Sequence, residues 1–380
     1  MRWIWREPIP RKPAVRPIRA LRAVRSLRAL WPLAAVVATL ATIALSGCTI
    51  DGPFKYTETK METRTVPVDG IATLETRLSS ADITVVTKEG AEAEFIITKT
   101  YKAHEREYGE KLLAETAVKI ERQGSRLVVA REDTKKVNVD MVFKGYVSIE
   151  ITATLPAGIA LDILTGSGDI LVGDRTAAIL IHAGSGDITV GSAGGGLDVK
   201  SGSGDVRLQA AKGTVKFSAG SGDFFGGDLE SATEGSTGSG EINIEKIVGD
   251  LMVSTGSGDV SVLSSTGKAS ARSGSGDMEF GGHEGGADIL TSSGDIAFAT
   301  SATEGEIDLK TSSGDIDVTL YGVESAELDI STMSGAITSK VPVVVKEASR
   351  RHLVGVAGDG RLKLKLETSS GNVSVDKGSI

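Results

Sequence analysis

The chain has 380 residues, of which 24% are charged and 4% are aromatic, and its formal net charge is −8. An acidic chain argues against binding to nucleic acid and against adhesion to anionic lipid by charge. So few aromatic residues also leave little surface on which sugars stack.

The first 47 residues differ in kind from the rest of the chain. Nine basic residues accompany a single acid, Glu7, and an apolar run from Ala29 to Leu45 leads into Ser46-Gly47-Cys48. This order predicts an export signal over 1–47. Its end resembles the bacterial lipoprotein signal, in which Cys48 is lipidated and becomes the first mature residue. Two alternatives stay open: an uncleaved membrane anchor, and a basic nucleic-acid-binding head, which no aromatic-interleaved module accompanies.

Removal of this segment changes the charge balance. Taking nine basic residues and one acid from 42 and 50 leaves 33 and 49, a net of about −16. The mature chain is therefore expected to be held at the membrane by its lipid and not by a basic face. Thr49 stands where Asp retains some lipoproteins in the inner membrane, which favours the outer membrane or the cell surface.

Residues 48–60 are polar and are predicted to form a tether, and 61–165 are predicted to form strands that cap a β-structure. The charged stretch Ala103–Thr116 has no β alternation and predicts a short helix. Leu78–Ile83 echoes the repeat described next, so the first coil is expected there. The predicted strands are Glu62–Val68, Ile71–Arg77, Asp82–Thr87, Glu94–Tyr101 and Tyr146–Leu155, with a hairpin of Val118–Glu121 and Leu127–Val129.

A tetrapeptide recurs through 166–332 at a fixed step. From Asp169 to Asp295 its acid advances by 18 residues each time, and then by 20 to Asp315. Such a period is typical of stacked copies of one structural unit. Gly-Ser-Gly-Asp or a close variant stands at Gly166–Asp169, Gly184–Asp187, Gly202–Asp205, Gly220–Asp223, Gly238–Glu241, Gly256–Asp259, Gly274–Asp277, Ser292–Asp295 and Ser312–Asp315.

Each unit contains two short runs with a period of two. In the unit Gly184–Ser201, Ile188 and Val190 flank Thr189, and a second run alternates in the same way. Period two predicts strands, and the glycines between the runs predict turns with positive φ. Stacked units bury the apolar columns together, so the sequence predicts an all-β, single-domain β-solenoid with coils of about 18 residues.

Two details of the inward columns stand out. One column stays small, which suits a narrow interior near the turn: Ala183, Ser201, Ala219, Thr237, Thr255, Ser273 and Thr291. Gly226 and Gly235 replace apolar residues in the coil Gly220–Thr237, which predicts a local pinch or slack there.

Residues 333–380 are predicted to form the final coils and a cap, interrupted by an insertion. Met333–Ala336 is a degraded copy of the turn, and Val341–Val345 is an apolar run that predicts a strand. Gly360–Glu367 alternates strictly, and Ser369–Val373 is the last copy of the turn.

The repeat resembles the toast-rack family, a widespread bacterial envelope family of unknown molecular function. The resemblance rests on the Ser-Gly-Asp-Ile turns, on Leu155–Gly158 before the first regular coil, and on the ending from Gly358 to Asn372. It covers nearly all of the mature chain. It implies a β-solenoid at the cell envelope, often lipid- or membrane-anchored, and adhesion belongs to the family only by inference.

The repeated acids are the first candidate site: Asp169, Asp187, Asp205, Asp223, Glu241, Asp259, Asp277, Asp295 and Asp315. Like charges about 4.8 Å apart repel, so something must offset the repulsion. In one interpretation, each carboxylate accepts backbone N–H bonds in its own turn. In the other, divalent cations lie between coils, although one carboxylate per coil is few for calcium, which takes about six to eight oxygens.

Catalytic chemistry has little support in the sequence. The four histidines, His104, His182, His283 and His352, share no metal-ligand spacing, and there is no nucleophile elbow or phosphate loop. Of Phe224, Phe225 and Phe280, at least two belong to inward columns. We therefore predict no enzyme, no cofactor, no metal site and no catalytic residue.

The remaining class is an interaction or structural protein. Outward residues are expected to form polar ladders, with Thr189, Arg207, Asn243, Ser261 and Glu279 on one face and Asp198, Lys200, Lys216 and Arg272 on the other. The hypothesis is an envelope lipoprotein whose acidic solenoid contacts an envelope or extracellular polymer or a protein. The alternatives are a periplasmic structural or sensor module, a cation-binding repeat protein and a polysaccharide-acting β-helix enzyme.

Overall fold

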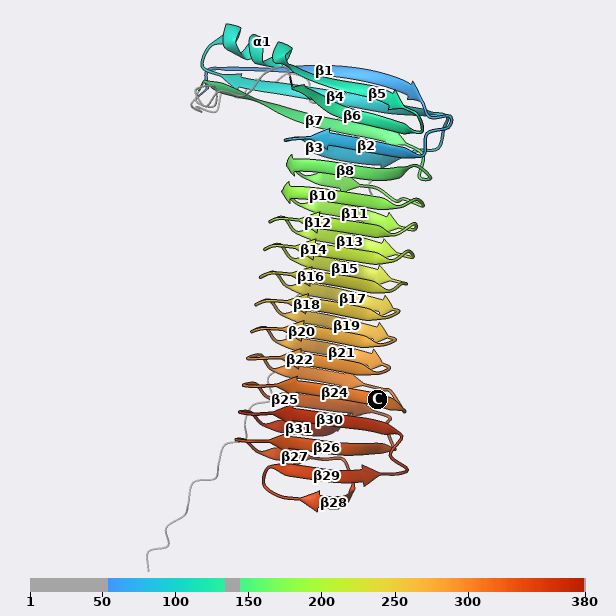
Figure 1. Cartoon of the computed structure of the whole chain (residues 1–380), viewed down its shortest axis with the longest axis vertical. Coiled ribbons are helices and arrows are strands. Elements are labelled where there is room, and N and C mark those ends of the chain that lie inside the picture. Colours follow the sequence, from blue (N-terminus) through green and yellow to red (C-terminus); the bar gives the residue numbers. More distant parts are fainter. Residues whose placement is uncertain (1–53, 134–143, 379–380) are drawn as a thin grey trace, which may run out of the picture. The chain divides into compact units, whose positions relative to one another are not determined.

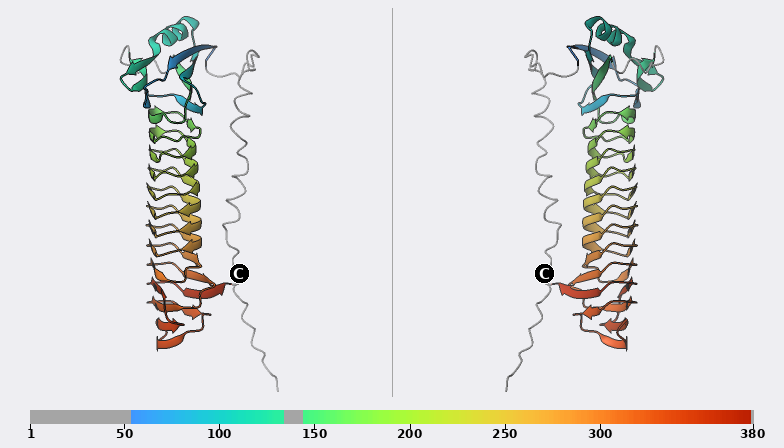
Figure 2. Two further views of the ribbon diagram at one scale, coloured as in Figure 1. Left: turned by 90° about the vertical axis from the view of Figure 1, so that its right-hand side faces the viewer. Right: turned by 90° about the vertical axis from the view of Figure 1, so that its left-hand side faces the viewer.

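The computed structural model describes residues 54–133 and 144–378. These residues form two large sheets, which we call sheet A (15 strands) and sheet B (16 strands), and the helix α1 (Arg106–Glu115). Figure 1 shows the strands stacked one above another, and Figure 2 shows the two sheets facing each other. The predicted all-β solenoid is confirmed. Cys48 and the predicted export signal lie outside the described residues.

In spatial order, sheet A consists of β1 (Tyr56–Pro67), β4 (Glu92–Ala103), β7 (Gly145–Leu155), β3 (Asp82–Thr87), β9 (Ile170–Val172), β11 (Ile188–Ala193), β13 (Val206–Ala211), β15 (Phe224–Leu229), β17 (Ile242–Val248), β19 (Val260–Thr266), β21 (Met278–Glu284), β23 (Ile296–Thr300), β25 (Ile316–Tyr321), β31 (Val373–Gly378) and β27 (Ile337–Ser339).

Sheet B consists of β28 (Val344–Ala348), β29 (His352–Ala357), β26 (Ala326–Thr332), β30 (Leu362–Thr368), β24 (Gly305–Thr311), β22 (Ala287–Thr291), β20 (Ala269–Ser273), β18 (Leu251–Thr255), β16 (Thr233–Thr237), β14 (Val215–Ala219), β12 (Leu197–Ser201), β10 (Ile179–Ser185), β8 (Ala160–Ser167), β2 (Thr73–Leu78), β6 (Arg126–Asp133) and β5 (Thr116–Gln123).

Each regular coil contributes one strand to each sheet. In a typical coil, β12 runs in sheet B, the turn 202–205 crosses over, and β13 runs in sheet A. Equivalent strands of successive coils pair in parallel and in register, as β12 does with β14 and β13 with β15. The alternation of the sequence sets this register, because the inward apolar side chains of both sheets form one core. Ile188 and Val190 are at most 1% exposed.

The coil with glycines in its inward columns is filled, and the predicted pinch or slack is not found there. The ring of Phe217 stacks on that of Phe224 with a centroid distance of 3.7 Å. A Cβ atom on Gly235 would lie 2.0 Å from the Phe217 ring, and one on Gly226 would lie 3.1 Å from the Phe224 ring. Two phenylalanines therefore occupy the space of the missing side chains, and β14, β16 and β18 stay in register.

The turn glycines are required mainly by close packing between coils. A Cβ atom on Gly204 would lie 1.7 Å from the carbonyl oxygen of Gly186 in the coil before it. The strands of neighbouring coils are one hydrogen bond apart, which leaves no room for a side chain at this place in the turn. Within the motif, the predicted positive φ is found at Gly168 and Gly186 and is wrong for the other copies. In the other turn of the coil it is found at Gly196, Gly249, Gly267 and Gly285.

The N-terminal region contains the expected strands and helix, but β1 begins at Tyr56, so the tether predicted over 48–60 is wrong for residues 56–60. The predicted hairpin is β5 and β6, which pair antiparallel, and the predicted helix is α1. Leu113 of α1 packs on the buried Tyr101 of β4. The coil predicted at Leu78–Ile83 is β2 and β3, which pair in parallel with β8 and β9 of the first regular coil. No helix in the described part of the chain has both the length and the apolar character needed to span a membrane.

A buried arginine holds the first regular coils to the segment before them. Arg175 is 1% exposed, and its guanidinium donates hydrogen bonds to the carbonyl oxygens of Pro156 and Ile159, the first at 2.6 Å. Within the described residues it has no carboxylate partner, and burial lowers the pKa of Arg175 to about 10. The sequence carried no signal for this contact, because arginine is usually exposed.

The C-terminal coils do not follow chain order. The strands β30 and β31 form a coil that lies between β24 and β25 on one side and β26 and β27 on the other. The residues predicted to form the last coils, 333–380, therefore include a coil, made of β30 and β31, that is inserted in space before the coil ending at Ser339. Of the strand expected at Val341–Val345, Val344 and Val345 alone fall in β28, which is exposed along its length and pairs with β29.

Candidate functional site

The repeated acids join successive coils. The carboxylate of Asp169 accepts a hydrogen bond from the backbone N–H of Asp187 at 2.9 Å, and Asp187 accepts one from Asp205 at 3.0 Å. The predicted bond within each acid's own turn is therefore replaced by a bond to the next coil. We call these residues the acidic ladder. The same bond is made by the carboxylates of Asp82, Asp205, Asp223, Asp259, Asp277, Asp295 and Asp315.

The ladder geometry favours a structural role over cation binding. One carboxylate oxygen of each bonded acid is engaged by a backbone N–H, which offsets the repulsion between neighbouring acids. The other oxygen leaves about one ligand per coil, while calcium takes about six to eight. Among the described residues, no group of three or more His, Cys, Asp or Glu is placed to hold a metal ion.

The ladder is interrupted where glutamate replaces aspartate. Among the described residues, no hydrogen bond joins the N–H of Asp259 to Glu241, whose carboxylate instead lies 3.4 Å from the side-chain amide of Asn243. The extra methylene carries the carboxylate past the position that aspartate occupies in the other coils. The ladder therefore has a gap between β17 and β19.

We expect Glu241→Asp to close this gap and to stabilise the protein by about 0.5–1.5 kcal/mol, the usual net worth of one hydrogen bond. The midpoint of chemical denaturation measures the change. The matched control is Glu304→Asp in an exposed loop. Equal midpoints for the two variants would contradict the proposed geometry.

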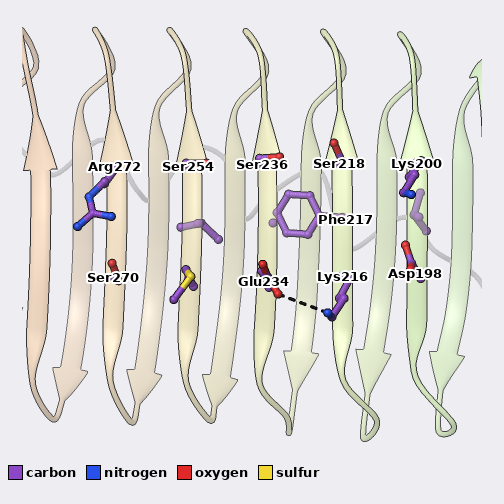
Figure 3. Close-up of a pocket in the computed structure, with 14 residues that line it drawn as sticks. Asp198, Lys200, Lys216, Phe217, Ser218, Glu234, Ser236, Ser254, Ser270 and Arg272 are labelled. Carbon is purple, nitrogen blue, oxygen red and sulfur yellow. Dashed lines mark ion pairs between the residues drawn. The ribbon is translucent and has the colours of Figure 1, made fainter.

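A shallow hollow crosses the outer face of sheet B and brings together one of the two predicted polar faces. It measures about 540 Å³ and includes Asp198, Lys200, Lys216 and Arg272, the residues expected on that face (Figure 3). The strands β12, β14, β16, β18 and β20 form its floor. A second hollow of about 420 Å³ shares Asp198 and Lys216 with it and continues toward Leu161 of β8.

Three serines line the middle of this hollow. Ser218, Ser236 and Ser254 occupy the same outward column on successive strands, and Lys200 and Arg272 occupy it at the two ends. Figure 3 shows these five side chains in one row. We call them the serine track. The hollow exists because three small side chains stand between two long ones, and four strand steps separate Lys200 from Arg272 by about 19 Å.

The neighbouring outward column holds charged side chains followed by an apolar one. Lys216 forms an ion pair with Glu234 at 3.6 Å, and Met252 beside them is 60% exposed. At the end of the serine track, Arg272 forms an ion pair with Asp288 at 3.2 Å. Among the described residues, Lys200 has no ion-pair partner. The sequence predicted the charged residues of this face but not the serines, because small polar residues on a strand carry no distinctive signal.

The opposite face, on sheet A, presents the other predicted ladder. Arg207 lies over the ring of Phe225, with its guanidinium carbon 4.9 Å from the ring centroid, and pairs with Asp205 at 2.9 Å. Phe224 and Phe280 are buried in the core as expected, at no more than 1% exposure. Burial raises the pKa of Glu279 on this face. The charge of Arg207 is therefore engaged within the sheet.

One of the four histidines is a core residue. His283 is fully buried, with its Nδ1 atom 2.8 Å from the Ser265 hydroxyl and its Nε2 atom 3.1 Å from the carbonyl oxygen of Gly286. A carbonyl only accepts, so Nε2 carries the proton and Nδ1 accepts from Ser265. Burial lowers the pKa of His283 below its ordinary value of 6.5.

This histidine makes stability fall in mild acid. Below about pH 6.5 the unfolded chain binds a proton that the folded chain does not, so we expect the free energy of unfolding to fall by up to about 1.4 kcal/mol per pH unit until the folded pKa is reached. Denaturation as a function of pH, compared between the protein and His283→Asn, measures this contribution. An identical slope in the variant would contradict it. His352 has the opposite sign, because hydrogen bonds to Asp329 and Glu347 raise its pKa.

Comparison with known proteins gives a family match over part of the chain. The family model described as Toastrack DUF4097 matches residues 195–376. No curated protein matches the chain. Three similar solved structures each cover 84% of this chain. A "putative cell adhesion protein" from Clostridium sporogenes is 13% identical, with a TM-score of 0.18 and all of its own chain covered. A "putative adhesin" from Bacteroides fragilis (15% identity, TM-score 0.25) and a "putative lipid binding protein" from Parabacteroides distasonis (16% identity, TM-score 0.27) each have 97% of their own chain covered. At these TM-scores the likeness carries no argument about function.

Proposed function

From the membership of residues 195–376 in the Toastrack family, we propose that this chain is a non-enzymatic module of the cell envelope that binds an extended partner along its coils. The observation that carries the proposal is the hollow on sheet B, which crosses five successive strands and is lined by exposed polar side chains. A partner that lies across the strands meets the same kind of surface at each coil. An extended polymer fits such a surface better than a compact ligand does.

The distribution of carboxyl groups supports a binding role over catalysis. An acid–base pair needs two neighbouring carboxyl groups whose pKa values differ. Among the described carboxyl groups, Glu279 on β21 has a raised pKa, whereas the pKa is lowered at Glu327, Asp359 and Glu367. These three lie on or beside the C-terminal strands β26 and β30 of sheet B, whereas β21 lies in sheet A.

We further propose that lipid on Cys48 anchors the module, after removal of residues 1–47, at the outer membrane or the cell surface. In this arrangement the tether is shorter than the predicted 48–60, because β1 begins at Tyr56. The cap of the solenoid then extends to residue 165, 166–332 holds the regular repeats and 333–380 the terminal coils. The support is the basic head, the apolar run and the single cysteine at the predicted cleavage position.

Fractionation of Cys48→Ala beside the wild type, with protease treatment of intact cells, tests this anchor. We expect the variant to leave the membrane fraction and the wild-type protein to be cleaved on intact cells. A variant that stays in the membrane would show that the apolar run is an uncleaved anchor. Protection of the wild type until the envelope is opened would replace the surface assignment with a periplasmic scaffold or sensor.

A further inference from the structure

The serine track differs in charge from the rest of the chain. Beyond residue 47 the sequence carries a net charge of about −16, yet both ends of the serine track are cationic. Lys200 has no ion-pair partner among the described residues, and the pair of Arg272 with Asp288 uses one of several guanidinium donors. The hollow also contains the carboxylates of Asp198 and Glu234, so the acidic groups of a partner are expected to pair with the two cations at the ends of the serine track.

The space between the two cations suits hydroxyl-rich groups. In the described structure no hydrogen bond engages the side chains of Ser218, Ser236 and Ser254, and each hydroxyl both donates and accepts. They recur at the strand spacing of about 4.8 Å. Met252, exposed in the neighbouring column, adds an apolar contact beside Ser254. A row of hydroxyls with one apolar side chain and no aromatic ring matches a sugar chain held by hydrogen bonds.

We infer that the serine track binds one strand of an anionic glycan, which runs across β12 to β20 along the stacking direction. Its acidic groups pair with Lys200 and Arg272, and its hydroxyls bond to the three serines. This inference rests on the proposed function and names the class of polymer. Nucleic acid, the other common anionic polymer, is disfavoured because Phe217, the aromatic residue that lines the hollow, is buried, so bases find no exposed ring on which to stack.

The test uses the full chain, purified in detergent, and oligogalacturonates of increasing length as the probe. We expect affinity to rise until the oligomer spans both cations, about 19 Å, and then to level off. Lys200→Glu with Arg272→Glu should weaken binding at least about ten-fold, because each cation then becomes a repelling charge. The matched control, Lys212→Glu with Lys246→Glu, makes the same change of charge at exposed positions outside the hollow and should bind as the wild type does.

Three outcomes would overturn the inference: no binding of oligogalacturonates, equal weakening by the control pair, or equal binding of neutral maltooligosaccharides. Ser236→Tyr separates failure of the inference from failure of the proposed function, since it fills the middle of the hollow without changing charge. Neutral sugars that bind and are blocked by this variant would remove the anionic class and leave polymer binding at the hollow in place.

Discussion

Replacement of Gly204 by alanine is expected to destabilise the protein by about 3 kcal/mol or more, the upper range for overpacking. The new Cβ atom would stand 1.7 Å from the carbonyl oxygen of Gly186, and both atoms belong to backbone that is fixed by ladders on either side. Relief requires the coil to move away from its neighbour, which breaks the bond from the Asp205 N–H to Asp187.

Denaturation midpoints and amide hydrogen exchange measure this effect. Because each coil contacts its neighbours only, the loss of protection should centre on β12 and β13 and fade along the stack. The control is Gly158→Ala, since a Cβ atom there meets nothing within 4 Å. A Gly204 variant as stable as the control would contradict the close packing of coils.

The second large effect is expected at Phe217, whose replacement by alanine should lower stability by about 3–5 kcal/mol. The ring is 4% exposed, stacks on Phe224 and lies under Gly235. Gly235→Ala should also destabilise, because its Cβ atom would lie 2.0 Å from that ring.

A smaller side chain at position 217 should compensate for a larger one at position 235. In Phe217→Leu the branched side chain leaves part of the ring's volume empty, so Gly235→Ala should cost less in that background than in the wild type. A double-mutant cycle measures the coupling, which we expect to exceed about 1 kcal/mol for residues in contact. Strict additivity would show that the ring does not depend on the glycine.

The fold was largely predictable because the same sequence pattern recurs in every regular coil. Period-two runs such as Ile188–Val190 identify strands, and stacking follows from the fixed step of 18 residues. The order of the C-terminal coils was not predictable, since the sequence of Leu362–Gly378 does not indicate between which coils this segment lies. Only the three-dimensional pairing places it between β24–β25 and β26–β27.

The details of the site were harder to predict for a different reason. Gly235 looked like a defect because the sequence does not show that Phe217, 18 residues earlier, fills the space from the preceding coil. Each acid of the acidic ladder was expected to bond within its own turn, because the same residue can make either a local hydrogen bond or one to the next coil. The charged residues of sheet B were recognisable one by one, whereas the hollow depends on three serines between Lys200 and Arg272.

We expect this protein to meet its partner on the outer face of sheet B. A photo-crosslinking amino acid placed at Ser236, in cells, tests it most directly, with Ser261 on β19 of sheet A as the matched half-buried position on the other face. We expect crosslinks to high-mass envelope polymer from Ser236 and none from Ser261. Crosslinks from Ser261 alone, or from neither position, would contradict it.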